Sequence, residues 1–361
     1  MLMSDILPVK SPNDGSMDQL CAKLGDLSSK WHTVDHWPEE SLRLCGGAGV
    51  YRWFLTESEG GLGWSEADQI RGYLRLAAAD LTTTFIITQY MGAIRRIAGS
   101  ANRSVAERWL PRLICGDAFA TVGISHLTTS RQHLGQPALL ASKTEGRFVL
   151  QGQAPWVTGA PHADLYVVGA SLGDGREILA AVERSVPAVV PGRGVELVAL
   201  SASCTDRVEF RGVTLDDSML LAGPIENVMR SGVGAGTGGL QTSTLAVGLS
   251  RAAVGYLAKE SLAREDLRPA ADELLSEVEQ LESWLLRSAD GETGRDASAI
   301  RGSANRLVLR STQAALTAAK GAGFVQGHPV GRWCREALFF LVWSCPQPIA
   351  QAHLCELAGI E

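Results

Sequence analysis

The chain has 361 residues, of which 45% are hydrophobic and 20% are charged, enough apolar sequence for a large core and for two or three domains. A formal net charge of −6 gives no overall attraction to nucleic acid or to an anionic membrane, so neither is an expected partner. The longest apolar run, residues 337–343, is far shorter than the roughly 20 residues that cross a bilayer, and no signal-peptide pattern begins the chain, which predicts a cytoplasmic protein.

The N-terminal part is predicted to be helical. Residues 1–16 contain Ser, Pro, Asn, Asp and Gly without a period and are expected to form a flexible tail. Pro38, followed by two glutamates, begins a helix that ends at Gly46-Gly47, and Ser65 before acidic residues has the pattern of an N-cap. Residues 17–117 are therefore predicted to be a helical domain.

The middle of the chain is predicted to be β-rich. From Phe119 the hydrophobic period shifts toward two, and short apolar runs separated by Gly and Pro continue to about Leu221. These runs, one of which covers residues 195–200, predict that residues 118–222 form a β barrel or sandwich. Helical spacing returns after Gly223-Pro224, so residues 223–361 are predicted to be a helical bundle.

The stretch 146–170 is predicted to hold a ligand-facing loop. Its two apolar runs indicate a pair of strands joined as a hairpin-like unit, and the loop between them carries Trp156 and Thr158. In an extended segment, residues two apart point to one face, so the indole and the hydroxyl would meet the same planar ligand. The residues alone also fit a core Trp beside a turn Thr.

Neither the cysteines nor the histidines predict a metal site. The seven cysteines are odd in number and never form a C-x-x-C pair, which argues against a disulfide framework and against zinc. His32 and His36 are one helical turn apart, but no third ligand is near them, so a surface pair is the preferred interpretation.

Six segments resemble motifs of the acyl-CoA dehydrogenase superfamily of flavoproteins and follow the same order. They are ESEGGLGWSEAD, WLPRLICGDAFATVGIS, LQGQAPWVTGAPHADLYVVGA, SCTDRVEFRGVTL, VGLSRAAVGYLAKESLAR and GAGFVQGHPVGRWCREA. The resemblance runs from about Leu20 to the C-terminus. It implies an α+β fold with a helical N-terminal domain, a central β domain and a C-terminal four-helix bundle, and a homodimer or homotetramer with flavin at a subunit interface.

The resemblance also implies where a flavin would bind. The family's Trp-x-Thr loop lies against the isoalloxazine, which assigns Trp156 and Thr158, and Ser125 stands where the family has a Thr beside the flavin. Arg264 matches an Arg that holds the cofactor's diphosphate from a neighbouring subunit. Two glycines match the loop through which the backbone approaches that diphosphate: Gly321 and Gly323. The implied cofactor is FAD, with FMN and an apo protein as the alternatives.

The catalytic position of the family is changed in this chain. In the family, the R-D-A motif is followed seven residues later by a Glu that removes the α-proton of the thioester, whereas this chain has R-E-A beginning at Arg335 and Ser344 at the Glu position. An earlier helix that holds the base in some members, here residues 238–247, contains no carboxylate. Because general-base catalysis typically contributes about 10²–10⁴-fold, ordinary α,β-dehydrogenation is not expected, and the catalytic residue is left unassigned.

Three other side chains are candidates for proton transfer. Cys345 adjoins the base position, but no His or basic residue beside it in sequence would favour the thiolate. His126 stands where the family has a Glu near the flavin, and His328 lies in the loop before Pro329; a histidine can donate a proton near neutral pH. The structural alternatives are a buried thiol and two loop or interface histidines.

Three functions remain open from the sequence. The first is a flavin-dependent oxidoreductase that acts on an acyl thioester or related small molecule, with atypical or impaired dehydrogenation and an electron-transfer partner. The second is a flavin-dependent monooxygenase that oxidises N, S or C on the same fold and needs a flavin reductase. The third is a non-catalytic paralogue that serves in binding or assembly.

Overall fold

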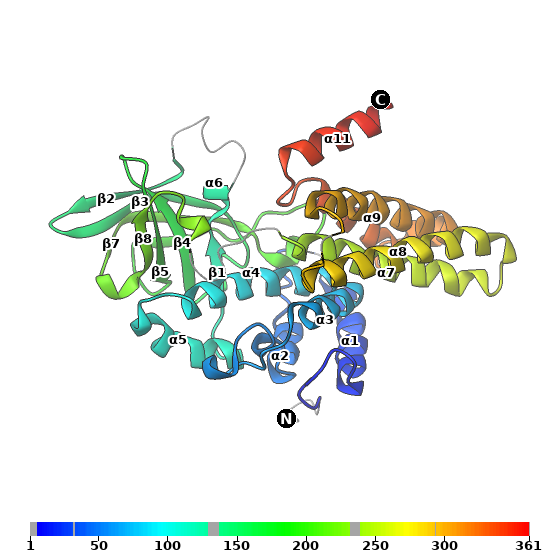
Figure 1. Ribbon diagram of the computed structural model, residues 1–361, viewed down its shortest axis with the longest axis horizontal. Helices are drawn as coiled ribbons and strands as arrows, with labels where there is room; N and C mark the ends of the chain where they lie inside the picture. Colours follow the sequence, from blue (N-terminus) through cyan, green and yellow to red (C-terminus); the bar gives the residue numbers. More distant parts are fainter. Residues whose placement is uncertain (1–5, 32, 129–136, 232–238, 293, 361) are drawn as a thin grey trace.

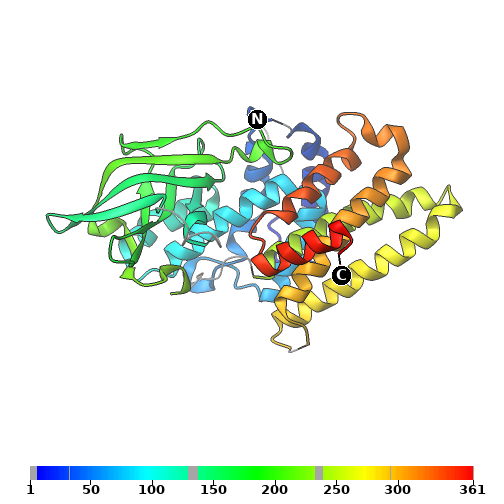
Figure 2. The same ribbon diagram turned by 90° about the horizontal axis from the view of Figure 1, so that it is seen from above.

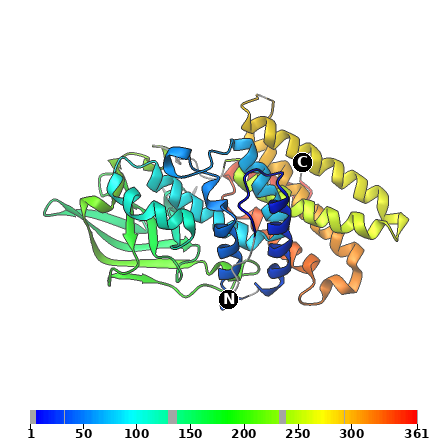
Figure 3. The ribbon, with the colours of Figure 1, turned by 90° about the horizontal axis from the view of Figure 1, so that it is seen from below.

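The molecule is elongated, with a β domain at one end, a helical bundle at the other and the N-terminal helices across the middle (Figure 1). Figures 2 and 3 show the same three parts from above and from below. The structure is a computed structural model, and it describes residues 6–31, 33–128, 137–231, 239–292 and 294–360. The predicted α+β fold, helical at both ends and β in the middle, is confirmed.

The N-terminal helices follow the predicted local signals. They are α1 (Gly15–Leu27), α2 (Glu39–Gly47), α3 (Glu66–Ala79), α4 (Leu81–Ala98) and α5 (Arg103–Cys115). The helix after Pro38 ends at the glycine pair, as predicted, and the Ser65 hydroxyl accepts a hydrogen bond of 3.1 Å from the backbone N–H of Asp68. Nearly every residue of α4 is buried, so this helix lies at the centre of the fold.

The structure differs from the predicted flexible tail at residues 6–14. Val9 is fully buried, and its N–H donates to the carbonyl of Ala48 at 2.9 Å. The Trp64 indole N–H donates to the carbonyl of Lys10 at 3.1 Å. A segment without helical or strand period is thus held by single contacts that sequence patterns do not report. Residues 1–5 and His32 lie outside the described residues.

The described strands form one sheet in the order β6-β7-β3-β2-β4-β5-β8, with β1 pairing β4. Their bounds are β1 (Ala120–Gly123), β2 (Leu139–Thr144), β3 (Arg147–Val157), β4 (Leu165–Ser171), β5 (Glu177–Glu183), β6 (Val189–Pro191), β7 (Asp206–Leu215) and β8 (Leu220–Ile225). The pairs β1–β4 and β2–β4 are parallel and the others antiparallel. Along β4, Leu165 and Val167 face the helical core, whereas Tyr166 and Val168 face a second core inside the β domain.

Three details of the predicted β domain are wrong. The strands β3 and β4 are not a hairpin, because β3 pairs with β2 and β7 while β4 pairs with β1, β2 and β5. Residues 195–200 are not a strand; Leu200 has a positive φ of 63° and leads into a 3-10 turn. The last strand, β8, continues to Ile225, past the boundary predicted at residue 222.

The C-terminal part is a helical bundle that packs against α3. Its helices are α7 (Gln241–Ser261), α8 (Arg268–Ala289), α9 (Ala297–Ala319), α10 (Pro329–Ala337) and α11 (Gln347–Ala358), with 3-10 turns η9 (Lys320–Phe324) and η10 (Leu338–Leu341). A Cβ at Gly248 of α7 would lie 2.7 Å from the Leu74 carbonyl oxygen, so glycine allows α7 and α3 to approach closely. Among the helices that the structure describes, none has the length and hydropathy needed to cross a bilayer.

Candidate functional site

The end of β3 is irregular and turns one aromatic side chain outward. The register between β3 and β7 shifts between Ala154 and Val157, and Trp156 has a positive φ of 56°. This conformation is unfavourable for a bulky residue. The indole of Trp156 is 65% exposed, whereas Val157 beside it is fully buried. The bulge therefore presents an aromatic ring at the edge of the β domain.

The prediction that Trp156 and Thr158 share one face is wrong. Thr158 is only 2% exposed, because the irregular backbone at Trp156 breaks the alternation on which that prediction depended. Its hydroxyl accepts a hydrogen bond of 3.3 Å from the Thr205 hydroxyl, which lies 2.8 Å from the Ser203 hydroxyl. Thr158 is thus one end of a buried chain of hydroxyl groups behind the indole.

Ser125 is joined directly to the Trp156 loop. It begins the single helical turn α6 (Ser125–Thr128), just after β1, and is partly exposed. Its hydroxyl donates to the carbonyl of Pro155 at 2.8 Å, in the residue before Trp156. Two of the predicted cofactor-binding residues are therefore brought together by the fold.

His126 adds a proton-accepting group next to Ser125. Its Nε2 lies 2.9 Å from the carbonyl oxygen of Gly169, so Nε2 carries the proton. Burial lowers the pKa of His126, which keeps the ring neutral near pH 7 and leaves a lone pair on Nδ1. Within the described part of the chain, Nδ1 is buried and has no hydrogen-bond partner. The ring can accept one proton or one hydrogen bond there.

The other predicted cofactor residues meet at the far end of the bundle. The Arg264 guanidinium donates at 2.8 Å both to the Glu260 carboxylate and to the carbonyl of Ala318, near the end of α9. Gly321 and Gly323 follow in η9. A Cβ at Gly323 would lie 2.8 Å from the Ala319 Cβ, so this turn has no room for a side chain there. Arg264 thus lies against the glycine loop.

One chain does not bring these two groups together. In all three views, the C-terminal ends of α7 and α9 lie on the side of the bundle away from β3 and α6 (Figures 1, 2 and 3). Three apolar side chains at this end of the bundle are strongly exposed: Leu262 at 79%, Phe324 at 86% and Val325 at 65%.

Ser344, the residue predicted to stand at the superfamily's base position, lies on a turn held by hydrogen bonds. Ser344 is exposed and has a positive φ of 45°. The preceding carbonyls of Phe340 and Trp343 accept hydrogen bonds of 3.2 and 2.8 Å from the buried Arg301. The ring of Trp343 stacks on Phe339 with centroids 5.0 Å apart. The backbone here is fixed, but Ser344 has no group that would act as a base near neutral pH.

The two remaining candidates have properties that argue against proton transfer. Burial raises the pKa of the Cys345 thiol, and the nearby Arg301 charge only partly opposes this, so the thiol stays protonated near pH 7. His328 caps α10, its Nδ1 accepting a hydrogen bond of 3.3 Å from the N–H of Val330. Its ring also packs edge-on against Tyr256, which places it in the bundle.

Sequence reasoning missed the buried charged residues, of which Glu336 and Arg96 are two. Glu336 of α10 is 2% exposed and lies 3.6 Å from the Arg332 guanidinium, and burial raises its pKa to about 7. Arg96 of α4 is 8% exposed. The only sequence signals were the acidic residue within the R-E-A motif and two arginines that end an otherwise apolar helical segment.

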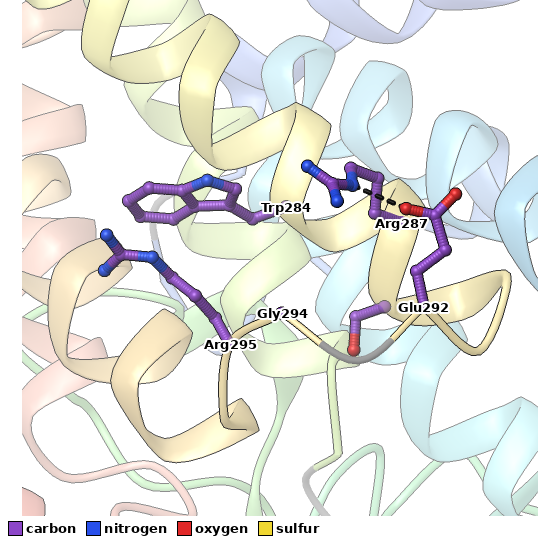
Figure 4. Close-up of a pocket in the computed structure, with 6 residues that line it drawn as sticks. Trp284, Arg287, Glu292, Gly294 and Arg295 are labelled. Carbon is purple, nitrogen blue, oxygen red and sulfur yellow. Dashed lines mark hydrogen bonds and ion pairs between the residues drawn. The ribbon is translucent and has the colours of Figure 1, made fainter.

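A hollow of about 280 Å³ between α8 and α9 contains none of the predicted residues (Figure 4). The Arg295 guanidinium lies 3.8 Å from the centre of the Trp284 ring, and Arg287 donates to Glu292 at 2.6 Å. The charged groups of this hollow are thus already engaged. Across the residues that the structure describes, no cluster of three or more His, Cys, Asp or Glu side chains suits a metal, and all seven cysteines are free.

Curated relatives are acyl-CoA dehydrogenases. Benzylmalonyl-CoA dehydrogenase of Aromatoleum aromaticum is 26% identical over 193 residues, 51% of this chain and 49% of that protein. Mitochondrial isobutyryl-CoA dehydrogenase of Dictyostelium discoideum is 22% identical over 54% of this chain and 48% of its own length. The acyl-CoA dehydrogenase of Bacillus subtilis is 20% identical over 84% and 85%. The match thus spans about half the length of the first two relatives. No family model matches the sequence.

Solved structures agree along almost the entire chain. Glutaryl-CoA dehydrogenase in complex with glutaryl-CoA superposes with a TM-score of 0.79 at 16% identity, covering 96% of both chains. The chain thus has the fold of the acyl-CoA dehydrogenase superfamily and is similar in sequence to curated acyl-CoA dehydrogenases. Butyryl-CoA dehydrogenase from Megasphaera elsdenii has a TM-score of 0.78 at 17% identity, covering 99% of this chain and 98% of that one.

The superfamily fold is also seen with a bound FMN. KijD3 in complex with FMN and a dTDP-linked amino sugar has a TM-score of 0.75 at 19% identity, with 96% of this chain and 92% of that chain covered. The fold of the acyl-CoA dehydrogenase superfamily therefore occurs both with an acyl-CoA complex and with an FMN complex.

Proposed function

We propose that this protein is a flavin-dependent oxidoreductase that acts on an acyl thioester or a related small molecule, with no carboxylate at the superfamily's base position. The observation that carries the proposal is the 65% exposed indole of Trp156, held at a positive φ beside Ser125. A fixed and exposed aromatic ring suits stacking on a planar ring system such as isoalloxazine. When bound, the flavin supplies the capacity to take up and release electrons.

The residues present fit a flavin dinucleotide if two copies of the chain associate. The Arg264 guanidinium and the exposed backbone at Gly321 suit a diphosphate, because a cation and exposed backbone N–H groups both favour anions. Gly323 is buried against Ala319 and allows the turn to form. Arg264 and the glycine loop lie away from Trp156 in the same chain, so a second copy has to supply them. The exposed Phe324 and Val325 beside the loop are consistent with such contact. We therefore propose FAD bound across a homo-oligomer interface.

We assign the orientation of the flavin ring and the acceptance of a proton to named side chains. Trp156 and Ser125 orient the ring, and Thr158 supports them from the buried hydroxyl chain. His126 is our choice for the proton-accepting group, because its neutral Nδ1 has a free lone pair and lies next to Ser125 in the chain. Ser344 and Cys345 hold no base that is ionised near neutral pH.

A flavin-dependent monooxygenase is the second candidate. Two observations favour it: Ser344 replaces the carboxylate, and the fold resembles KijD3, whose structure contains FMN and an amino sugar nucleotide. Such an enzyme would require a flavin reductase, whereas a dehydrogenase would pass electrons to an electron-transfer partner.

The test begins with the visible absorbance of the purified protein, before and after addition of FAD or FMN. Anaerobic mixing with a panel of acyl-CoA thioesters follows. Bleaching of the flavin by substrate alone supports dehydrogenation, and a requirement for external reductant and oxygen supports the monooxygenase. If the protein is colourless and binds neither flavin, the dehydrogenase and monooxygenase hypotheses are both excluded. The binding or assembly function then remains. Trp156→Ala tests the assigned ring-stacking residue: the variant should lose flavin affinity but remain folded, because Trp156 is exposed.

A further inference from the structure

Helix α10 and the turn η10 after it contact the N-terminal domain at two points. In α10, the Arg332 guanidinium donates to the carbonyl of Ser28, just after α1. In η10, the ring of Phe339 lies edge-on to the ring of Phe85 in α4, with centroids 4.9 Å apart. This part of the bundle is therefore a junction with the N-terminal helices.

Three buried charged side chains meet at this junction. Glu336 of α10 is 2% exposed, and Asp80, the N-cap residue of α4, is 3% exposed. The Arg332 side chain is 13% exposed, its Nε lies 3.6 Å from Glu336 Oε1, and its charge favours the ionised form of Asp80. We call these three side chains the Asp80–Arg332–Glu336 cluster. The cluster contains two carboxyl groups and one guanidinium.

The two carboxyl groups are held differently. Asp80 accepts hydrogen bonds from the N–H of Thr83 at 3.2 Å and from its hydroxyl at 2.5 Å, and both favour the ionised carboxylate. Glu336 Oε2 is buried and has no hydrogen-bond partner in the described part of the chain. Two ionised carboxylates beside one guanidinium would leave a net negative charge away from water, which is unfavourable. Glu336 is therefore the group that retains a proton.

The charges around Glu336 agree with this assignment. Burial raises the pKa of Glu336 to about 7, the charge of Asp80 adds to the shift, and the charges of Arg332 and Arg335 oppose it. Arg335 is exposed and donates to a carbonyl of its own helix, so water screens its charge. Helices α7 and α9 also pack against α10. They carry two titratable side chains at this contact: Tyr256 of α7, beside Trp333, and Arg301 of α9, which donates to the carbonyls of Phe340 and Trp343.

We infer that the Asp80–Arg332–Glu336 cluster is a proton-dependent contact, which holds α10 and η10 against the N-terminal domain while Glu336 is neutral and releases them when its proton passes to solvent. Water can hydrate the ionised Glu336 only if α10 moves away from Asp80. The turn at Ser344 follows η10 directly and would move with this segment. Because the pKa of Glu336 is raised from 4.5 to about 7, release should begin above pH 4.5 and be complete near pH 7.

The experiment measures hydrogen–deuterium exchange of the full-length protein at pH 5 and pH 8. Protection factors correct for the faster intrinsic exchange at high pH, and residues 329–341 are compared with α8 in the same sample. Glu336→Gln keeps the group neutral, and Asp80→Asn removes the second carboxylate with a residue that still caps a helix. The control is the exposed Glu107→Gln. Thermal unfolding at pH 5 shows that each variant is folded.

In the wild-type protein, the protection of residues 329–341 relative to α8 should fall at least about tenfold between pH 5 and pH 8. Glu336→Gln and Asp80→Asn should both suppress this fall, the first because no charge forms and the second because Arg332 is left to pair with Glu336 alone. Glu107→Gln should behave as the wild type. Equal relative protection at the two pH values, or a fall that either cluster variant retains, would overturn the inference. A loss of protection shared equally by α8 would also overturn it, since the opening would then be global. None of these outcomes bears on flavin binding.

Discussion

Trp156 at the end of β3 and Ser344 after η10 occupy similar backbone positions in two different regions. Each has a positive φ, 56° and 45°, and each is exposed. Each is also held by neighbouring hydrogen bonds, from Ser125 to the carbonyl before Trp156 and from Arg301 to the carbonyl before Ser344. The side chains differ: one is a large aromatic ring that suits a cofactor, and the other is a small hydroxyl without acid–base capacity near neutral pH.

The comparison shows that the backbone conformation of a site can be considered apart from the chemistry of its side chain. A positive φ at a residue other than glycine costs roughly 1–2 kcal/mol, and the surrounding contacts have to offset it. Around Ser344, the offset comes from the hydrogen bonds of Arg301 and the stacking of Trp343 on Phe339. The backbone at Ser344 is thus fixed, and our proposal places the superfamily's base position there, without its carboxylate. Substitutions in the two regions can test whether only the side chain has changed.

The largest effect is expected for Ser344→Glu. If the turn at residue 344 is still aimed at the substrate, a carboxylate there should raise the rate of α,β-dehydrogenation by roughly 10²–10⁴-fold. Stability should change little, because residue 344 is exposed and already has the positive φ. The rate is measured as anaerobic bleaching of the flavin by an acyl-CoA. Ser344→Gln is the control for size, and equal rates for both variants would show that the turn no longer faces the substrate.

Trp156→Ala should lower the affinity for flavin by about 10–100-fold, because it removes the stacking surface of an aromatic ring. The melting temperature of the flavin-free protein should hardly change, since the indole is 65% exposed. Flavin affinity is measured by quenching of flavin fluorescence, with Trp156→Phe as the conservative variant that retains most of the binding. A loss of stability with unchanged flavin affinity would assign Trp156 to the core of the β domain instead.

Features set by residues close in sequence were predictable, and features that depend on distant partners were not. The N-cap at Ser65 was found because its partner is Asp68, three residues away. The burial of Thr158, away from the face of Trp156, was missed because it depends on the irregular register with β7, where Val157 pairs with Asp206. The order of the motifs nevertheless indicated the fold and the assignment of Ser125 and Trp156, which the structure brings together.

The buried charges belong to the same class of omission. Arg96 becomes buried because α4 packs against β1, and Glu336 because α10 packs near the start of α4, where Asp80 lies. Neither contact leaves a pattern in the helix itself. A hydrophobic period shows which face of a helix is buried, but not which charged residue the neighbouring elements enclose.

Glu336→Gln should flatten the dependence of stability on pH in the region that leads to Ser344. Burial, reinforced by the charge of Asp80 and opposed by that of Arg332, raises the Glu336 pKa from 4.5 to about 7. The native state therefore binds this proton more tightly than the unfolded state does. The stabilisation is fully present below pH 4.5 and is lost as pH rises through about 7.

The wild-type protein should therefore lose up to about 3 kcal/mol of unfolding free energy from this group between pH 5 and 8, and Glu336→Gln should not. Urea unfolding at both pH values measures the difference. The exposed Glu107→Gln provides the control and should follow the wild type. Parallel pH profiles for wild type and Glu336→Gln would show that the carboxyl is solvated or fully paired in the native state.

The smallest effect is expected for Thr158→Val, which tests how far flavin binding at the Trp156 loop depends on the buried hydroxyl groups of Thr158, Thr205 and Ser203. Removal of the hydroxyl that accepts from Thr205 should lower stability by about 1 kcal/mol, because it leaves a buried donor without its acceptor. If Thr158 also contacts the flavin, affinity should fall by roughly fivefold, the equivalent of one net hydrogen bond. Thr205→Val is the matched control, since it breaks the same internal bond but retains the Thr158 hydroxyl. Equal losses of flavin affinity in the two variants would mean that Thr158 acts only by holding the Trp156 loop. The Trp156 indole would then be the feature that makes this loop, and not the turn at Ser344, suitable for a cofactor.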